Sequence, residues 1–216
     1  MKVGILICAY NEGKYIRKVV NKCLKYVKKV IVVDDGSKDN TLDEVRKTKA
    51  KILRHGKNKG KGEALRKGFD YGIKEGYDYL ILLDGDGQHD PKEIPKFLEA
   101  IKGNPDLVVG CRMKRHSSMP YQRRVSNFAT SVAISVTYGT WIKDTQSGYR
   151  AVRLKSLKKL KLKGKGYDLE SEMLIKMMKK KANIWAVPIK TIYGDEKSSI
   201  NPVRDSIKFV RSFFRK

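Results

Sequence analysis

The chain has 216 residues, a hydrophobic fraction of 40% and three scattered cysteines, so it can form one large domain with a full core and does not need disulfides. Its formal net charge of +25 favours partners that are polyanions, such as nucleic acid, anionic lipid or phosphorylated substrates. No signal peptide and no apolar run of about 18 residues is visible, so we expect a cytoplasmic protein that does not cross a membrane by itself.

The first half of the chain alternates short apolar runs with amphipathic stretches. Buried strands are predicted at five of these runs, 2–9, 30–33, 51–53, 79–83 and 107–109. Helices are predicted between them, where apolar residues recur at helical spacing. This alternation predicts an α/β fold with a Rossmann-like, mostly parallel sheet that helices cover on both faces.

Polar clusters follow three of these strands. They are Tyr10–Glu12, Asp34–Ser37 and Asp84–Gln88. In open parallel sheets, ligands bind beyond the carboxyl ends of the strands. The sequence therefore predicts a binding site at this edge of the sheet.

The third cluster carries two aspartates that are two positions apart. In an extended chain, Asp84 and Asp86 point the same way, and Gln88 adds a neutral oxygen. Oxygen ligands without histidine or cysteine suit Mg²⁺ or Mn²⁺. The alternative is a polar turn that caps a helix beginning near Pro91.

A basic, glycine-rich loop spans 57–62, before the third predicted helix. It lacks the spacing of a P-loop, and no Gly-x-Gly-x-x-Gly opens a helix. Neither an ATPase nor a dinucleotide site is supported.

The second half is less regular. We predict helices at 125–136 and 167–178, and a polar turn at 143–150 between them. A last strand is predicted at 184–192, where Pro188 indicates an edge or a bulge.

The end of the chain predicts one more helix. Apolar residues recur there at helical spacing and are flanked by lysine and arginine, a pattern that suits an anionic membrane surface. Packing of this helix on the core or on a second subunit is the alternative. We therefore divide the chain into a domain at 1–197 and a basic amphipathic helix at 198–216.

Seven motifs in this order resemble the family 2 glycosyltransferases of the GT-A fold. The resemblance covers about residues 3–197 and is nearest to the polyprenyl (dolichyl) phosphate sugar synthases, such as the dolichyl-phosphate mannose synthases. The motifs are Ala9-Tyr10-Asn11-Glu12, Asp34-Asp35-Gly36-Ser37, Asn58–Gly62, Asp84–Gln88, Gly110-Cys111-Arg112, Asp144–Arg150 and Tyr193–Lys197.

The resemblance implies a role for residues in most of these motifs. The donor, a nucleotide sugar, would be bound by Ala9, Tyr10, Glu12, Asp35, Lys61, Asp84 and Gln146, and Asp144 is a further candidate for the sugar hydroxyls. The ion, Mg²⁺ or Mn²⁺, would be held by Asp84, Asp86 and Gln88.

The acceptor implied is a polyprenyl phosphate, which is already a nucleophile and needs cationic positioning. Its phosphate would be held by Arg112, Arg123, Arg124, Ser126 and Lys197. A solvated loop is the alternative for Arg123 and Arg124. The catalytic residues implied are Asp86, Arg112, Arg123 and Glu172, with Glu170 as a rival to Glu172.

The function implied is transfer of mannose, glucose or N-acetylglucosamine from a GDP- or UDP-sugar to polyprenyl phosphate, with inversion, by a protein peripheral to the cytoplasmic face of the membrane. One alternative acceptor is a glycan or glycolipid hydroxyl, for which Glu170 or Glu172 would be the base. The other alternative is a basic nucleic-acid-binding protein. No recognition helix or RNA-binding aromatic motif supports it, so we expect no nucleic-acid partner.

Overall fold

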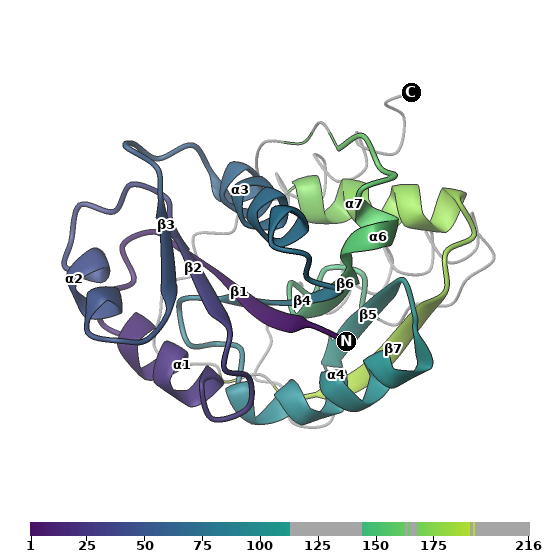
Figure 1. Ribbon diagram of the computed structural model, residues 1–216, viewed down its shortest axis with the longest axis horizontal. Helices are drawn as coiled ribbons and strands as arrows, with labels where there is room; N and C mark the ends of the chain where they lie inside the picture. Colours follow the sequence, from purple (N-terminus) through teal and green to yellow (C-terminus); the bar gives the residue numbers. More distant parts are fainter. Residues whose placement is uncertain (113–143, 163, 165–167, 191, 193–216) are drawn as a thin grey trace, which may run out of the picture.

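Seven strands form one sheet in the computed structural model, which describes residues 1–112, 144–162, 164, 168–190 and 192 (Figure 1). The strands are β1 (Val3–Ala9), β2 (Val30–Asp34), β3 (Lys51–Arg54), β4 (Tyr79–Asp84), β5 (Leu107–Arg112), β6 (Arg150–Arg153) and β7 (Ile184–Ile189). Their order across the sheet is β3-β2-β1-β4-β6-β5-β7.

The sheet is mostly parallel, as the sequence predicted. β1 pairs in parallel with β2 and β4, and β5 with β7, whereas β6 runs antiparallel to both β4 and β5. The reversed strand was not predicted, because four residues carry no signal of strand direction. β7 ends the strand order, so Pro188 lies on an edge strand as expected.

Helices cover both faces of the sheet. They are α1 (Ile16–Cys23), α2 (Thr41–Arg46), α3 (Lys61–Lys74), η1 (Pro91–Glu93), α4 (Ile94–Ala100), η2 (Ile101–Gly103), α6 (Leu154–Leu157) and α7 (Asp168–Lys179). In Figure 1, α3, α6 and α7 lie above the sheet, and α1 and α4 lie below it.

The core explains why the central strands are apolar throughout. On β1, Ile5 and Ile7 pack with residues of α1 and α4, whereas Leu6 packs with residues of α3 and α7. All three side chains are fully buried. Because successive residues of a strand face opposite sides, a sheet covered on both faces needs apolar residues at every position.

Two predicted helices, at 125–136 and 198–216, lie outside the described residues. Within the described ranges, no helix has both the length and the apolar character to span a bilayer.

Candidate active site

The loops after β1 and β2 are joined by hydrogen bonds. Asp35 N–H donates to the carbonyl of Ala9 at 2.9 Å, and Asn11 N–H donates to Oγ of Ser37 at 3.0 Å. Glu12 N–H donates to Oγ1 of Thr41 at 2.7 Å. The structure thus places the predicted nucleotide-binding residues of these two loops together.

The loop after β4 joins the same edge of the sheet. Cys8 is in register with Asp84, and Gly85 N–H donates to the carbonyl of Cys8 at 3.2 Å. The three polar clusters therefore converge at the carboxyl ends of adjacent parallel strands. This is the place where the sequence predicted the site.

The carboxylate of Asp35 is hydrogen-bonded to other groups of the protein. The side chain is buried, and its Oδ2 accepts the N–H of Gly60 at 2.7 Å, while Lys59 N–H donates to Oδ1 at 3.1 Å. Nδ1 of His55 lies 2.7 Å from the same Oδ1. This carboxylate, which the resemblance assigned to donor binding, therefore anchors the basic glycine-rich loop.

Lys61, at the start of α3, lies between two carboxylates. Its Nζ is 2.6 Å from Oδ1 of Asp84 and 3.2 Å from Oε2 of Glu170. Burial alone would lower the pKa of Lys61, but the two carboxylates outweigh it and raise the pKa well above its usual value. Burial likewise opposes ionisation of Asp84, and Lys61 reverses that effect, so the pKa of Asp84 is lowered.

Gly148 lies against this buried ion cluster. A Cβ at this position would be 3.2 Å from Oε1 of Glu170, 3.4 Å from Nζ of Lys61 and 3.5 Å from Oδ2 of Asp84. The absence of a side chain at Gly148 therefore lets the polar turn pack directly on the charged groups.

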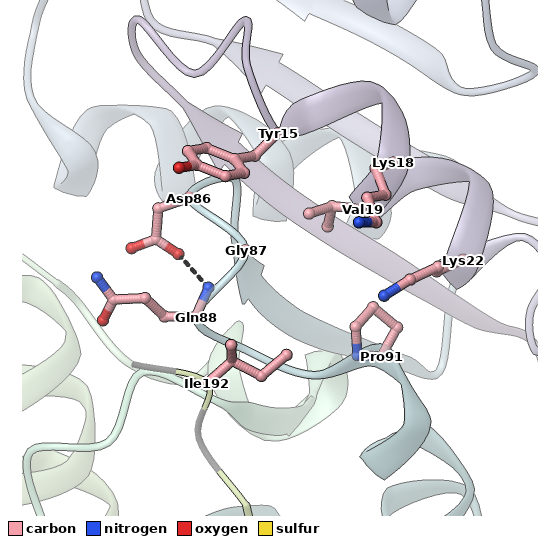
Figure 2. A pocket seen from close by; sticks show the side chains of 9 residues that line it. All are labelled: Tyr15, Lys18, Val19, Lys22, Asp86, Gly87, Gln88, Pro91 and Ile192. Atoms are coloured by element: carbon pink, nitrogen blue, oxygen red, sulfur yellow. Dashed lines mark hydrogen bonds between the residues drawn. The ribbon is translucent and has the colours of Figure 1, made fainter. Parts of the chain in front are cut away.

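Asp86 and Gln88 line a pocket of about 170 Å³ (Figure 2). Gln88 N–H donates to Oδ1 of Asp86 at 2.9 Å, and Ile192 N–H donates to the carbonyl of Gln88 at 3.0 Å. Figure 2 shows the two side chains next to each other, with Lys18 and Lys22 of α1 across the pocket.

The oxygens of this loop are of the kind that a hard divalent ion prefers. Mg²⁺ commonly takes one or two carboxylates and completes its shell with phosphate and water, which Asp84, Asp86 and Gln88 would allow. Among the described residues, no group of three or more His, Cys, Asp or Glu side chains is arranged as a metal site. The donor set fits an ion that also needs ligands from a bound nucleotide.

His89 is hydrogen-bonded to the start of the loop after β4. Asp84 N–H donates to Nδ1 of His89 at 3.1 Å, and the imidazole ring lies 4.9 Å from the ring of Tyr149. Burial lowers the pKa of His89 despite the nearby Asp84, which favours the neutral ring that this hydrogen bond requires. This geometry gives His89 a structural role.

Arg112 and Asp144 bind each other. Nε and Nη2 of Arg112 donate to the two carboxylate oxygens of Asp144 at 2.6 and 2.7 Å. The sequence predicted a lipid-phosphate contact for Arg112 and a sugar contact for Asp144.

The structure describes one of the other predicted residues of this region. Gln146, a predicted donor-binding residue, has an exposed side chain. Four other predicted acceptor residues lie outside the described residues: Arg123, Arg124, Ser126 and Lys197.

Of the two rival glutamates on α7, Glu170 is the one at the ion cluster. Glu172 instead accepts the N–H of Gly164 at 2.7 Å and pairs with Lys176 at 2.6 Å. Two positions on a helix differ by about 200°, so the two side chains face opposite ways. Glu170, the rival candidate, therefore lies beside Lys61, and Glu172 pairs with Lys176 on another face of α7.

Arg150 is a residue whose role sequence reasoning missed. It is 1% exposed and donates to the carbonyls of Thr145, Ser147 and Glu170, at 2.9, 2.7 and 2.6 Å. It thereby ties the polar turn to the first turn of α7, which carries Glu170. An arginine followed by two apolar residues is the only signal in the sequence, and it does not distinguish a buried arginine from an exposed one.

Known proteins are similar to this chain in sequence and in fold. A sequence profile of glycosyl transferase family 2 matches residues 4–161. The chain is 38% identical to the UDP-N-acetylglucosamine–dolichyl-phosphate N-acetylglucosaminyltransferase of Methanococcus voltae, over 89% of this chain and 86% of that relative. It is 30% identical to the undecaprenyl-phosphate mannosyltransferase of Micrococcus luteus, over 96% of this chain and 91% of that relative.

Among solved structures, the fold is similar to that of glucosyl-3-phosphoglycerate synthase from Mycobacterium tuberculosis, crystallised with Mn²⁺, UDP and glucosyl-3-phosphoglycerate. The TM-score is 0.77 at 18% identity, and the match covers 98% of this chain and 78% of the other. The predicted GT-A fold is confirmed by this likeness.

Proposed function

The chain belongs to glycosyl transferase family 2, and we propose on this basis that it transfers a sugar from a GDP- or UDP-sugar to a polyprenyl phosphate, with inversion. The observation that carries the proposal is the convergence of the Tyr10, Asp35 and Asp84 loops at one sheet edge. Relatives named for transfer to dolichyl and undecaprenyl phosphate support this choice of acceptor.

The proposed reaction is a single displacement. A phosphate oxygen of the lipid attacks the anomeric carbon, the bond to the donor's diphosphate breaks, and the nucleoside diphosphate leaves. The lipid phosphate is an anion at neutral pH, so no strong general base is required. The chain's own task is to position two anions, and Lys61, held between Asp84 and Glu170, supplies a buried cation beside the loop that follows β4.

Asp86, Gln88 and Asp84 would hold Mg²⁺ or Mn²⁺ together with the donor. When bound, such an ion neutralises the charge that develops on the leaving nucleoside diphosphate. The loop presents Asp86 at the rim of a pocket, where a nucleotide can share the ion. Metal dependence is therefore part of the proposal.

We also propose that the protein acts as a peripheral protein at the cytoplasmic face of the membrane. The support is the basic amphipathic pattern of 198–216 and an acceptor whose head group stays at the bilayer surface. Deletion of residues 200–216 should weaken sedimentation with anionic liposomes. Unchanged sedimentation would remove this helix from the membrane contact.

A donor panel tests the main proposal. Radiolabelled GDP-mannose, UDP-glucose and UDP-N-acetylglucosamine would each be incubated with the protein, polyprenyl phosphate and Mg²⁺ or Mn²⁺, and the lipid extracted into butanol. We expect one donor to label an acid-labile, alkali-stable lipid. Label that enters only water-soluble glycan would contradict the lipid-phosphate acceptor.

One observation favours a second candidate acceptor, a glycan or glycolipid hydroxyl. Such an acceptor needs a base, and Oε1 of Glu170 is buried with no hydrogen-bond partner among the described residues. Product analysis with polyprenyl phosphate against a glycan acceptor separates the two candidates. The nucleic-acid alternative rested mainly on net charge, and family membership accounts for the motifs without it.

A further inference from the structure

Helix α1 differs from other helices of the fold in the balance of its charges. The segment 13–33, which contains α1, has no aspartate or glutamate. Its cations are Lys14, Arg17, Lys18, Lys22, Lys25, Lys28 and Lys29. On α2, α3 and α7, by contrast, cations pair with acids of the same helix. The pairs are Arg46–Asp43, Arg66–Glu63 and Lys176–Glu172. The charge of α1 is therefore not neutralised within its own helix.

Lys18 and Lys22 lie on one face of α1. Residues four positions apart on a helix are neighbours, and like charges at this spacing destabilise it. Arg17 pairs with Glu44 of α2 at 3.9 Å, whereas Lys18 and Lys22 form no ion pair within the part of the chain that the structure describes. An anion from outside the chain that approached both ammonium groups would offset this repulsion.

The same face continues beyond the end of the helix. Val27 N–H donates to the carbonyl of Cys23 at 3.0 Å, so the helical turn extends past α1. Lys25 lies seven positions after Lys18, which is close to two turns, and is exposed. Tyr26 follows and is 39% exposed. We call Lys18, Lys22, Lys25 and Tyr26 the α1 surface.

The α1 surface adjoins the candidate active site. Lys18 and Lys22 line the pocket that Asp86 and Gln88 also line (Figure 2). A second segment without acids, 145–167, contains α6, which lies on the other side of the sheet (Figure 1) and does not line this pocket. Position, and not charge alone, therefore distinguishes α1.

Resting on the proposed function, we propose that the α1 surface binds the head groups of anionic phospholipids and thereby holds the pocket of Asp86 and Gln88 next to the bilayer. Ammonium groups are attracted to anionic lipid, and tyrosine is suited to the boundary between head groups and acyl chains. Nucleic acid would match the charge, but it offers no such boundary for Tyr26. The surface is separate in sequence from 198–216, and two separate contacts fix an orientation that one contact leaves free.

Sedimentation of the full chain with phosphatidylcholine vesicles, with and without phosphatidylglycerol, tests the inference. The triple variant Lys18→Gln, Lys22→Gln and Lys25→Gln keeps residues 198–216. Each lysine that approaches an anionic surface contributes about fivefold to partitioning, so this variant should bind the anionic vesicles about a hundredfold more weakly. Equal binding of the wild-type protein to the two kinds of vesicle would overturn the inference.

A matched control removes the same charge on the other side of the sheet. Lys155, Lys158 and Lys159 are exposed in and after α6, and their joint replacement by glutamine should weaken binding by less than about fivefold. Equal losses in the two triple variants would contradict a specific surface, since only total charge would then matter. Binding of the wild-type protein to duplex DNA but not to vesicles would contradict a lipid partner.

A second variant reports contact directly. Tyr26→Trp adds an indole to a chain that has two tryptophans, and vesicles of brominated phosphatidylglycerol should quench the added emission. Tyr71→Trp on α3, across the sheet from α1, is the control and should not be quenched. Equal quenching at both positions, or none at position 26, would refute the proposed orientation. Sugar transfer in detergent involves no bilayer, so its failure in wild-type protein would instead count against the proposed function.

Discussion

Two acidic loops leave β2 and β4, and their carboxylates have different kinds of partner. Asp34 and Asp35 are buried and accept hydrogen bonds from backbone N–H groups of their own and the next loop. Asp84 is paired with the ammonium of Lys61, and Asp86 lines a pocket and accepts the backbone N–H of Gln88. Backbone donors fix a buried carboxylate in place, whereas a carboxylate that pairs with a lysine side chain or faces a pocket can change partners when a ligand binds. The first loop is thus built as a scaffold and the second as a reactive edge.

The largest effect should come from the second loop. Asp84→Ala and Asp86→Ala should each lower kcat/KM about a thousandfold or more, because charge that develops on the leaving diphosphate would lose its stabilisation. Butanol-extractable label measures this. Asp70→Asn on the exposed face of α3 is the control and should retain activity. Near-wild-type activity in both loop variants would contradict the ion-binding role.

The same change in the first loop should act on stability. Asp35→Ala should lower the free energy of unfolding by about 3 kcal/mol, because it leaves buried N–H groups without an acceptor. Asp86→Ala should lower it by less than about 1 kcal/mol. Urea unfolding monitored by circular dichroism measures both. Equal losses in the two variants would end the distinction between scaffold and reactive edge.

The two glutamates of α7 should differ in their effect on activity. Glu170→Gln removes one of the carboxylates that hold Lys61 and should lower kcat/KM by about tenfold to a hundredfold. Glu172→Gln changes the opposite face of the same helix and should lower it by less than about threefold. Steady-state kinetics with a saturating acceptor compares the pair. The reverse order would favour Glu172, the residue predicted from the sequence.

The smallest effect is expected at Arg112. Arg112→Lys replaces two parallel hydrogen bonds to Asp144 by a point charge and should cost about 1 kcal/mol of stability. A double-mutant cycle with Asp144→Asn measures this coupling. If Arg112 also holds the lipid phosphate, the KM for the acceptor will rise in Arg112→Lys while that for the donor stays constant. An unchanged acceptor KM would leave Arg112 with a structural role.

Local patterns predicted much of this fold. Short apolar runs such as Leu80–Leu83 favour strands buried on both faces, and the polar residues that end them lie at one edge because the strands are parallel. The reversed β6 was not predictable, since Arg150–Arg153 is too short to reveal its direction. The partners of individual side chains were not predictable either.

The sequence by itself determined the alternation of strands and helices and the edge of the sheet that carries the acidic groups, because these follow from spacing between near neighbours. Only the tertiary structure decided that Glu170 approaches Lys61, that Glu172 faces away and that Asp35 contacts His55. Those choices depend on how elements far apart in the chain approach each other and on the rotation of each helix about its axis. Residue type and order do not encode that rotation locally.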